Sequence, residues 1–423
     1  MKFNYGKIFV LGFGFFGVSV IWGIYNAFVP IFLANKFNLA PALIGFFMTL
    51  DNIAALFIQP PVGAWSDRLR TPLGRRLPFI LAGAPITAIA FGLIPMAAML
   101  PLFVACTSTL LLSAALWRTP VVALMPDITP SQSRSQANGI INFMGGIGTI
   151  VALQTGGILY NISPSFPFWL GSLLVVIAAL IVFLFVREPK NYEENAEIQP
   201  NMIESLREVL NDEDKSGARI LYAIFFWFLG YSAVETFFTL YAQKHLGINA
   251  GDGATLLSVF PLFFVLFAIP SGFIAARIGR RVAISIGLIV VAVVLALLYI
   301  LPAETLLSAI SPLPLVGIPL TEGGPRMLTV EGVLLIFGGI GWAFVNINSL
   351  PMVVELTSAA RIGTFTGLYY LFSTLSAIVG PNVNGWAIQL TGNNYNVVML
   401  IAPFFMLAAL ILMLGVRRGE ATV

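Results

Sequence analysis

The sequence predicts an all-α membrane protein with twelve membrane-spanning helices, arranged as two pseudo-symmetric six-helix bundles. Of its 423 residues, 58% are hydrophobic and only 10% are charged, whereas about a quarter of the residues in a soluble domain are charged. The apolar residues form long runs, and a helix needs about 20 of them to cross a bilayer. The two halves of the chain also repeat the same loop motifs. These three observations indicate an integral membrane protein.

The apolar runs place the twelve spans. In the first half they lie at residues 8–34, 41–66, 78–100, 102–126, 137–160 and 166–187, and in the second half at 219–243, 253–276, 282–301, 330–354, 362–389 and 394–416. Residues 1–187 and 219–423 are therefore the two predicted bundles. The linker, 188–218, has apolar residues at helical spacing and predicts a short amphipathic helix on the membrane surface. Residues 302–330 are rich in proline and form the only long loop on the other side.

Basic residues predict the orientation, because Lys and Arg accumulate in cytoplasmic loops. With both termini inside, all but four of the 22 Lys and Arg residues fall in cytoplasmic segments. The exceptions are Lys36, Lys244 and Arg326 outside and Arg118 within a span. We therefore expect cytoplasmic N and C termini. Short loops without an organelle signal favour the cytoplasmic membrane of a prokaryote.

The composition excludes several classes of function. The single cysteine, Cys106, permits no intramolecular disulfide and no cysteine-based metal cage, and one histidine, His245, leaves little material for histidine chemistry. The net charge of +3 follows from the topology, so nucleic acid is not an expected partner. No ATPase motif is visible. We expect no cofactor, no metal and no enzymatic activity, and a monomer by default.

Repeated motifs connect the two halves. Residues 59–63 (QPPVG) and 74–76 (GRR) in the first half resemble 269–272 (IPSG) and 279–281 (GRR) in the second. Asp127 before Arg134 likewise resembles Glu355 before Arg361. Two six-span halves with matching loops are typical of duplicated carriers, whose substrate site lies near the bilayer midplane between the repeats. The repeat therefore predicts a transporter of a small molecule.

The first half resembles a known family. Residues 59–68 read QPPVGAWSDR and residues 74–80 read GRRLPFI, which is similar to the glycoside–pentoside–hexuronide symporters of the major facilitator superfamily. The resemblance is greatest to the branch that contains the plant sucrose/proton symporters. It implies the major facilitator fold, a sugar substrate and a coupling proton. The span plan covers the whole chain, whereas the family motifs lie almost entirely in the first half.

Span four and span two depart from the family patterns. The plant symporters have a Gln-Gly-Pro-x-Arg-Ala-Leu run in span four, but residues 118–124 here read RTPVVAL, so the family arginine falls on Val122. Arg118 lies one turn away on the same helical face. Melibiose permease has an Asp-x-x-x-Asp-Pro motif in span two for its coupling cation, where this chain has Ala55 and Gln59. A sodium site of that type is therefore not expected.

Three charged residues lie well inside the predicted spans, where charge is costly and commonly marks function. Asp51 and Glu235 are candidates for the coupling proton. Arg118 is a candidate for hydrogen bonding to sugar hydroxyl groups, with a structural ion pair as the alternative.

Sugar sites combine polar groups with aromatic platforms, and the spans contain several candidates of both kinds. Asn26 and Asn52 rank highest, because Asn26 lies midway along span one and Asn52 adjoins Asp51. Hydrogen bonding between helices is the alternative role for such amides. The further substrate-binding candidates are Trp22, Tyr25, Gln59, Asn142, Asn346, Tyr369 and Asn382.

Charged residues of the cytoplasmic loops are candidates for a gate. Asp67, at the end of span two, is placed to meet the positive N-terminus of span eleven, and the resemblance implies that such contacts break when the carrier opens inward. The predicted gate residues are Asp67, Arg68, Arg75, Arg76, Asp127, Arg134, Glu355 and Arg361.

We therefore expect a secondary transporter of a sugar or glycoside, coupled to protons and working by alternating access in the lipid bilayer. The alternative on the same fold is proton-coupled export of drugs or another small metabolite. Aromatic residues make up 13% of the chain, which suits either substrate class. A membrane-embedded enzyme and a receptor with a carrier fold are weaker alternatives.

Overall fold

The computed structural model describes residues 4–129, 133–188, 202–314, 316–321, 323–357 and 362–419. Within these ranges, eleven helical segments are long and apolar enough to cross a membrane, and α15 (Ile362–Leu390) is a further helix of 29 residues. The predicted fold class is therefore confirmed, and the chain is a multi-pass membrane protein. The helices group into two compact units, which are described separately.

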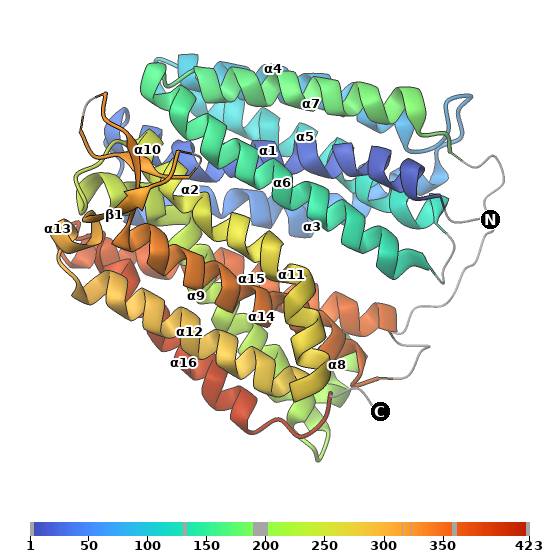
Figure 1. The fold of residues 1–423 in the computed structure, drawn as a ribbon. Helices are drawn as coiled ribbons and strands as arrows, with labels where there is room; N and C mark the ends of the chain where they lie inside the picture. Colours follow the sequence, from blue (N-terminus) through green and yellow to red (C-terminus); the bar gives the residue numbers. More distant parts are fainter. Residues whose placement is uncertain are drawn as a thin grey trace. The chain divides into compact units, whose positions relative to one another are not determined.

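Unit 1 comprises Met1–Leu39, Leu50–Glu194 and Ile248–Ser258. Its helix α1 packs along α6 and α7, and α4 packs along α5 and α7 (Figure 1). Large aromatic side chains, including Phe28, Phe91 and Trp117, are fully buried between these helices. The elements of unit 1 are α1 (Tyr5–Asn35), α3 (Leu50–Arg68), α4 (Leu77–Leu93), η1 (Ile94–Met96), α5 (Leu100–Ile128), α6 (Arg134–Ile162), α7 (Phe166–Phe185) and α10 (Ala250–Leu257).

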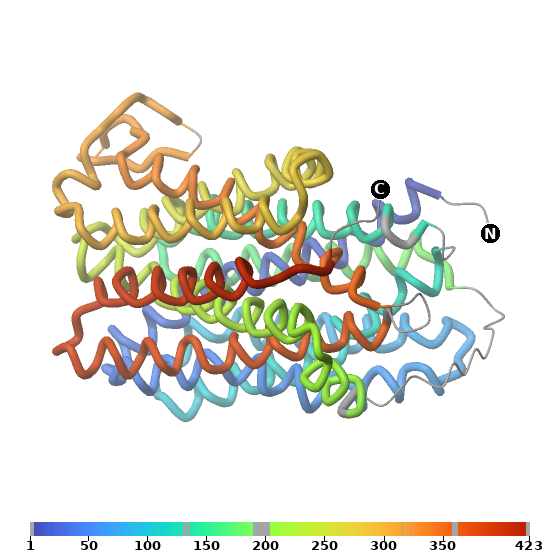
Figure 2. The backbone as a smooth tube through the Cα atoms, turned by 90° about the horizontal axis from the view of Figure 1, so that it is seen from below, coloured from blue at the N-terminus to red at the C-terminus, as the bar shows by residue number. Residues whose placement is uncertain are grey.

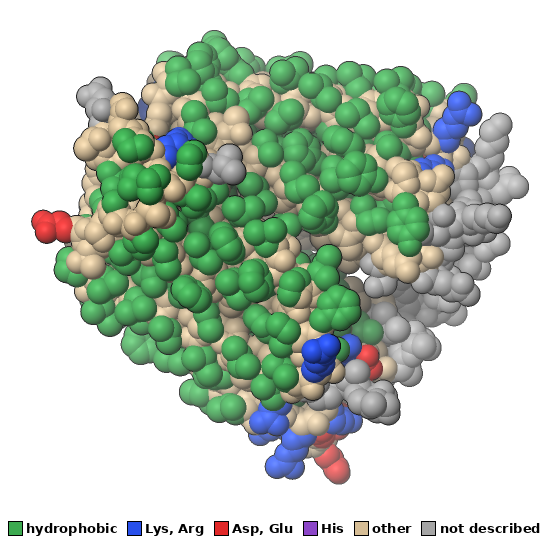
Figure 3. Space-filling model, in the orientation of Figure 1, with side chains coloured by type: hydrophobic (Ala, Val, Ile, Leu, Met, Phe, Trp, Pro, Cys, Tyr) green, Lys and Arg blue, Asp and Glu red, His purple; other side chains and the backbone are tan. Residues whose placement is uncertain are grey.

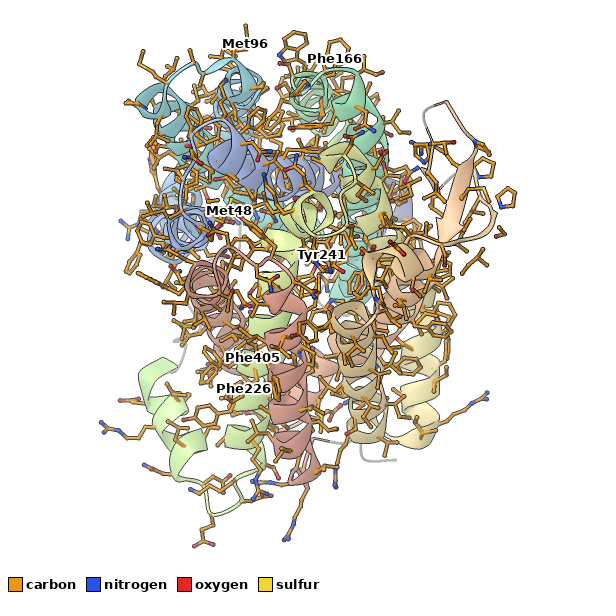
Figure 4. The ribbon with its side chains drawn as sticks, turned by 90° about the vertical axis from the view of Figure 1, so that its left-hand side faces the viewer. Met48, Met96, Phe166, Phe226, Tyr241 and Phe405 are labelled. Carbon is orange, nitrogen blue, oxygen red and sulfur yellow. The ribbon has the colours of Figure 1, made fainter. Side chains whose placement is uncertain are left out.

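Unit 2 comprises Ala40–Thr49, Asn195–Gly247 and Val259–Val423. Helix α9 lies against both α15 and α16, and α14 lies against α11 and α12 (Figure 2). In the end-on view of Figure 4, Phe226 of α9 and Phe405 of α16 lie close together in this packing. Its helices are α2 (Pro41–Met48), α8 (Met202–Asn211), α9 (Ser216–Lys244), α11 (Val259–Ile278), α12 (Arg280–Ile300), α13 (Ala303–Leu306), α14 (Val330–Val354), α15 and α16 (Val397–Leu414).

Two predicted spans are broken helices. Span two separates into α2 and α3 at Thr49, whose hydroxyl donates to the Phe46 carbonyl at 2.7 Å. Span eight separates into α10 and α11 at Ser258, whose hydroxyl bonds to the Thr255 carbonyl. Pro261 has no N–H to donate to the carbonyl of residue 257, which explains the second break. As a result, α2 packs on α15 within unit 2, and α10 packs on α6 within unit 1.

Glycines allow both of these short helices to pack closely. In unit 1, a Cβ at Gly157 would collide with the Gly251 carbonyl, and a Cβ at Gly251 would collide with the Gly157 carbonyl. In unit 2, a Cβ at Gly45 would collide with the carbonyl of Pro381, and one at Gly385 would meet the backbone of Pro41. Helices approach most closely where small residues face each other. The two contacts are thus built in the same way.

The segment between α12 and α14 is more structured than the predicted loop. It contains α13 and a small antiparallel sheet of β1 (Ala309–Pro312), β3 (Arg326–Thr329) and β2 (Ile318–Pro319), in that spatial order. Figure 1 shows the sheet at the end of unit 2 where α14 begins. The backbone N–H of Val330 donates to the Ser308 carbonyl at 3.2 Å, which ties the sheet to α14. The sequence predicted a long loop here and did not reveal this helix and sheet.

The helices expose apolar surfaces. On α12, Val282, Ile286, Ile289 and Val293 are each more than 40% exposed and follow one another at helical spacing. Hydrophobic side chains cover most of the face drawn in Figure 3, and Lys and Arg gather at the helix ends. A helix surface of this kind is stable against lipid rather than water.

Candidate functional site

The interior of unit 1 contains a narrow pocket between α1 and α5, which has no room for a water molecule in this structure. Trp22, Trp117 and Arg118 line it, together with Val18, Ile21 and Ala114. Trp22 also packs edge-on against Tyr25, with ring centroids 5.5 Å apart. The pocket thus combines one guanidinium group with two indole rings.

Asp51 lies near this pocket, at the start of α3. The amide of Asn52 donates to its carboxylate at 2.9 Å, and the Arg118 guanidinium acts on it electrostatically. The Asp51 charge in turn acts on the Tyr25 hydroxyl group. The structure therefore brings together five of the residues singled out in the sequence: Trp22, Tyr25, Asp51, Asn52 and Arg118.

Several polar groups around this pocket are buried without a hydrogen-bond partner among the described residues. They are the Tyr25 hydroxyl, the Trp117 indole N–H and the Thr119 hydroxyl. Buried polar groups are nearly always paired, and each unpaired one costs about 1–3 kcal/mol. Three such groups close to one arginine and one carboxylate are therefore suited to bind a polar ligand.

Unit 2 contains an aromatic cluster beside Glu235. Tyr231 stacks on Trp342 with ring centroids 4.4 Å apart, and Phe228 packs edge-on against Trp342 at 5.5 Å. Glu235, one turn along α9 from Tyr231, acts on its hydroxyl electrostatically. Trp342 was not among the residues predicted from the sequence. Its position on α14, one helical turn from the candidate Asn346, was the signal that could have identified it.

The other substrate candidates occupy separate positions. Asn142 is exposed and its amide bonds to the Asn138 carbonyl of its own helix at 2.9 Å. Tyr369 bonds to Ser349 at 3.1 Å, and Asn382 donates to the Ile378 carbonyl at 2.7 Å. The Asn142 amide thus bonds within its own helix, whereas the Asn382 amide also donates to the Thr49 hydroxyl between α2 and α3, at 3.4 Å. The remaining candidates, Asn26, Gln59 and Asn346, are half-buried on α1, α3 and α14.

The loop charges of unit 1 form a compact network. Arg75 and Arg76 bind the Asp127 carboxylate at 2.6 Å and 3.0 Å, and Arg76 also pairs with Asp67. Glu188 was not among the predicted gate residues, but its carboxylate accepts the backbone N–H groups of Arg75, Arg76 and Leu77 at 2.7–2.8 Å. It therefore caps the N-terminus of α4.

Unit 2 has a related but simpler pair. Arg280 is the first arginine of the second GRR motif, and it forms an ion pair with Glu355 at 3.3 Å. Of the other predicted gate residues, Arg68 is exposed at the end of α3, and Arg134 begins α6 with a side chain outside the described set. Arg361 lies outside the described residues.

The described residues form eleven long apolar helices and α15, with polar groups buried among them. Together with the repeated loop motifs, this arrangement is typical of a membrane carrier. The model of the Major Facilitator Superfamily matches residues 11–381, and the chain belongs to that superfamily. It is a transporter and not an enzyme.

Individual relatives agree with this assignment. The chain is 26% identical to multidrug resistance protein 1 of Bacillus subtilis (strain 168) over 239 residues, which cover 53% of this chain and 56% of that protein. It is 23% identical to the class E tetracycline resistance protein of Escherichia coli over 393 residues, or 92% and 91% of the two chains.

Solved structures share the fold. A bacterial homologue of the human lysosomal transporter Spinster matches with a TM-score of 0.75 and 14% identity, over 97% of this chain and 96% of that one. Both curated relatives are drug-resistance proteins. The superfamily is thus shown, whereas these relatives do not support the narrower resemblance to sugar symporters.

Proposed function

We propose that this protein is a proton-coupled symporter of a sugar or glycoside that works by alternating access. The observation that carries the proposal is the set of unpartnered buried polar groups around the Arg118 pocket. A solute with many hydroxyl groups satisfies such donors and acceptors, and the half-buried indole ring of Trp22 suits the apolar face of a sugar ring. An apolar drug would leave the same polar groups unpaired.

Arg118 and Asp51 supply the coupling. An opposite charge nearby favours the ionised form of a carboxyl group, and burial disfavours it. When a solute binds the Arg118 guanidinium, the positive charge of Arg118 offsets the negative charge of Asp51 less strongly. Asp51 then holds a proton more readily. Solute and proton therefore bind together, and Asn52 positions the carboxylate through its 2.9 Å hydrogen bond. Glu235 is the alternative coupling residue.

Alternating access would use the charged loops as a cytoplasmic gate, with Asp67, Asp127 and Glu355 as its acids. We place the protein in the cytoplasmic membrane of a prokaryote, with both termini inside, as a monomer. These assignments rest on the distribution of basic residues and on the superfamily.

A second function is favoured by specific observations. Proton-coupled export of drugs agrees with the names of the two drug-resistance relatives. In unit 2, the stacked Tyr231 and Trp342 rings beside Glu235 form a surface that suits an aromatic cation. Symport and antiport are distinguished by whether the proton moves in the same direction as the solute or in the opposite direction.

A liposome experiment tests the proposal. The purified full-length chain is reconstituted in liposomes with an internal pH dye, and a panel of mono- and disaccharides is added outside. Acidification of the interior with one sugar identifies symport and the substrate class together. The exporter would instead be supported by two results together. Correctly inserted protein would give no pH change with any sugar of the panel, and a drug such as tetracycline would make the interior more alkaline.

A further inference from the structure

Unit 2 contains a fully buried acid at the start of α14. Glu331, in the first turn of α14, has no exposed surface, and neither of its carboxylate oxygens has a hydrogen-bond partner among the described residues. The sequence did not single out this residue, because it lies at the edge of a predicted span where a charged side chain is common. Its complete burial results from packing against residues that are distant in the sequence.

Among the described residues, no charged side chain forms an ion pair with Glu331. The N-terminus of α14 is capped by Thr329, whose hydroxyl oxygen accepts the Gly332 N–H at 3.2 Å, so this N–H does not serve Glu331. The partial positive charge of a helix N-terminus is a weaker effect than the removal of a carboxylate from water. The neutral acid is therefore the form that fits the buried position.

The titratable groups on the neighbouring elements are few. Tyr241, near the end of α9 and labelled in Figure 4, is the group on which the Glu331 charge acts. Tyr241 stacks on His245 at 5.2 Å, and burial lowers the pKa of His245, so this side chain is neutral at pH 7. The remaining titratable groups on the elements around this end of α14 are Lys244 after Tyr241, Tyr299 on α12, Glu304 on α13 and Arg326 on β3.

We propose that Glu331 is a second proton-binding site of the transporter, at the end of unit 2 covered by α13 and the small sheet. The carboxylate takes a proton from water when the first turn of α14 is accessible, remains a neutral acid while buried, and returns the proton to water when the turn opens again. The role deepens the proposed proton coupling and rests on it.

Infrared spectroscopy of the full-length protein in liposomes tests the protonation state directly. At pH 7, wild-type protein should show the carbonyl stretch of a protonated carboxyl group that is missing from Glu331→Gln. The matched control, Glu304→Gln, removes an exposed acid of α13 and should leave the band in place. Identical spectra for wild type and Glu331→Gln would mean that Glu331 is ionised, and would overturn the proposal.

A transport measurement tests the role in the cycle. With the sugar that acidifies wild-type liposomes, Glu331→Gln should lose most proton uptake and retain exchange of labelled for unlabelled sugar. Unchanged proton uptake by this variant would overturn a role for Glu331 in coupling. If wild-type protein takes up no protons with any sugar, the proposed symport fails, whereas the infrared comparison still decides whether Glu331 binds a proton.

Discussion

Arg76 and Asp127 form a buried ion pair in unit 1: the atoms Nε and Oδ2 are 3.0 Å apart, and the side chains are only 5% and 11% exposed. The related pair in unit 2, Arg280 and Glu355, is 3.3 Å apart, but its side chains are 22% and 40% exposed. The same repeated motif therefore gives a buried network in one unit and a largely solvated pair in the other.

This difference predicts unequal effects of two equivalent substitutions. Asp127→Asn removes one of the two carboxylates that pair with the buried Arg76 guanidinium, the other being Asp67, and should lower the free energy of unfolding by about 1–3 kcal/mol. Glu355→Gln removes a solvated pair and should cost less than about 1 kcal/mol. Equilibrium unfolding in detergent measures both. Equal losses in the two variants would show that burial does not distinguish the pairs.

Glu188 should control the start of α4. Its carboxylate binds three consecutive backbone N–H groups, so Glu188→Ala leaves them exposed to exchange. We expect faster hydrogen exchange at Arg75, Arg76 and Leu77 and a loss of about 1–3 kcal/mol in local stability. Glu188→Gln keeps one acceptor oxygen and should have an intermediate effect. Unchanged protection in Glu188→Ala contradicts the capping role.

The contact between α6 and α10 should tolerate no side chain. Gly251→Ala would place a Cβ against the Gly157 carbonyl, and we expect a destabilisation of about 1–3 kcal/mol from overpacking. Gly139→Ala is the matched control, because a Cβ there meets no atom within 4 Å. Thermal melting of both variants in detergent checks the prediction, which fails if the two substitutions have the same effect.

Acid should loosen the C-terminal segment of unit 2. The hydrogen bond from Arg418 holds the pKa of Asp212 below its ordinary value, and hydrogen bonds from Ser216 together with the Arg418 charge do the same for Asp214. A carboxylate with a lowered pKa stabilises the folded state above its unfolded pKa and loses this effect as pH falls through the folded value. The stabilisation should therefore disappear below about pH 4.

Hydrogen exchange at the Arg417 amide reports on this attachment, because that N–H donates to the Ser216 hydroxyl oxygen at 2.9 Å. Its protection should fall with acid in wild-type protein and be low at every pH in Arg418→Ala. Protection in Arg418→Ala that equals wild type at pH 7 would exclude the ion pairs as its cause.

Arg118 should determine the affinity for the solute. Arg118→Gln removes charged hydrogen bonds to the solute and should weaken sugar binding about 10- to 100-fold. Arg118→Lys keeps the charge but not the planar fork, and should be impaired as well. Asn142→Ala, which alters an exposed amide bonded to its own helix, should bind normally. Binding is measured by counterflow, and unchanged counterflow in Arg118→Gln would remove Arg118 from the site.

Much of the fold could be predicted because the bilayer restricts a chain to long apolar helices. Spans two and eight were predicted as continuous helices, since their hydropathy does not reveal the breaks at Thr49 and Ser258. Pro261 was a visible signal for the second break. The sheet of residues 309–329 was missed because its strands are only two to four residues long and rich in proline.

The site could be predicted only in part. Asp51 and Arg118 were identifiable because charge within a span is rare and costly. Trp342 and Glu331 could not be identified in the same way. An aromatic residue within a span and an acid at the end of a span are ordinary features, and their surroundings are formed by residues far away in the sequence. The sequence also does not show that the amide of Asn142 bonds to its own helix.

The central claim is that a solute bound at the Trp22, Trp117 and Arg118 pocket is coupled to a proton on Asp51. The most direct test is Asp51→Asn in proteoliposomes with the sugar identified in the dye assay. We predict that uphill accumulation driven by a pH gradient disappears, whereas exchange of labelled for unlabelled sugar persists. Normal accumulation by Asp51→Asn would contradict the claim.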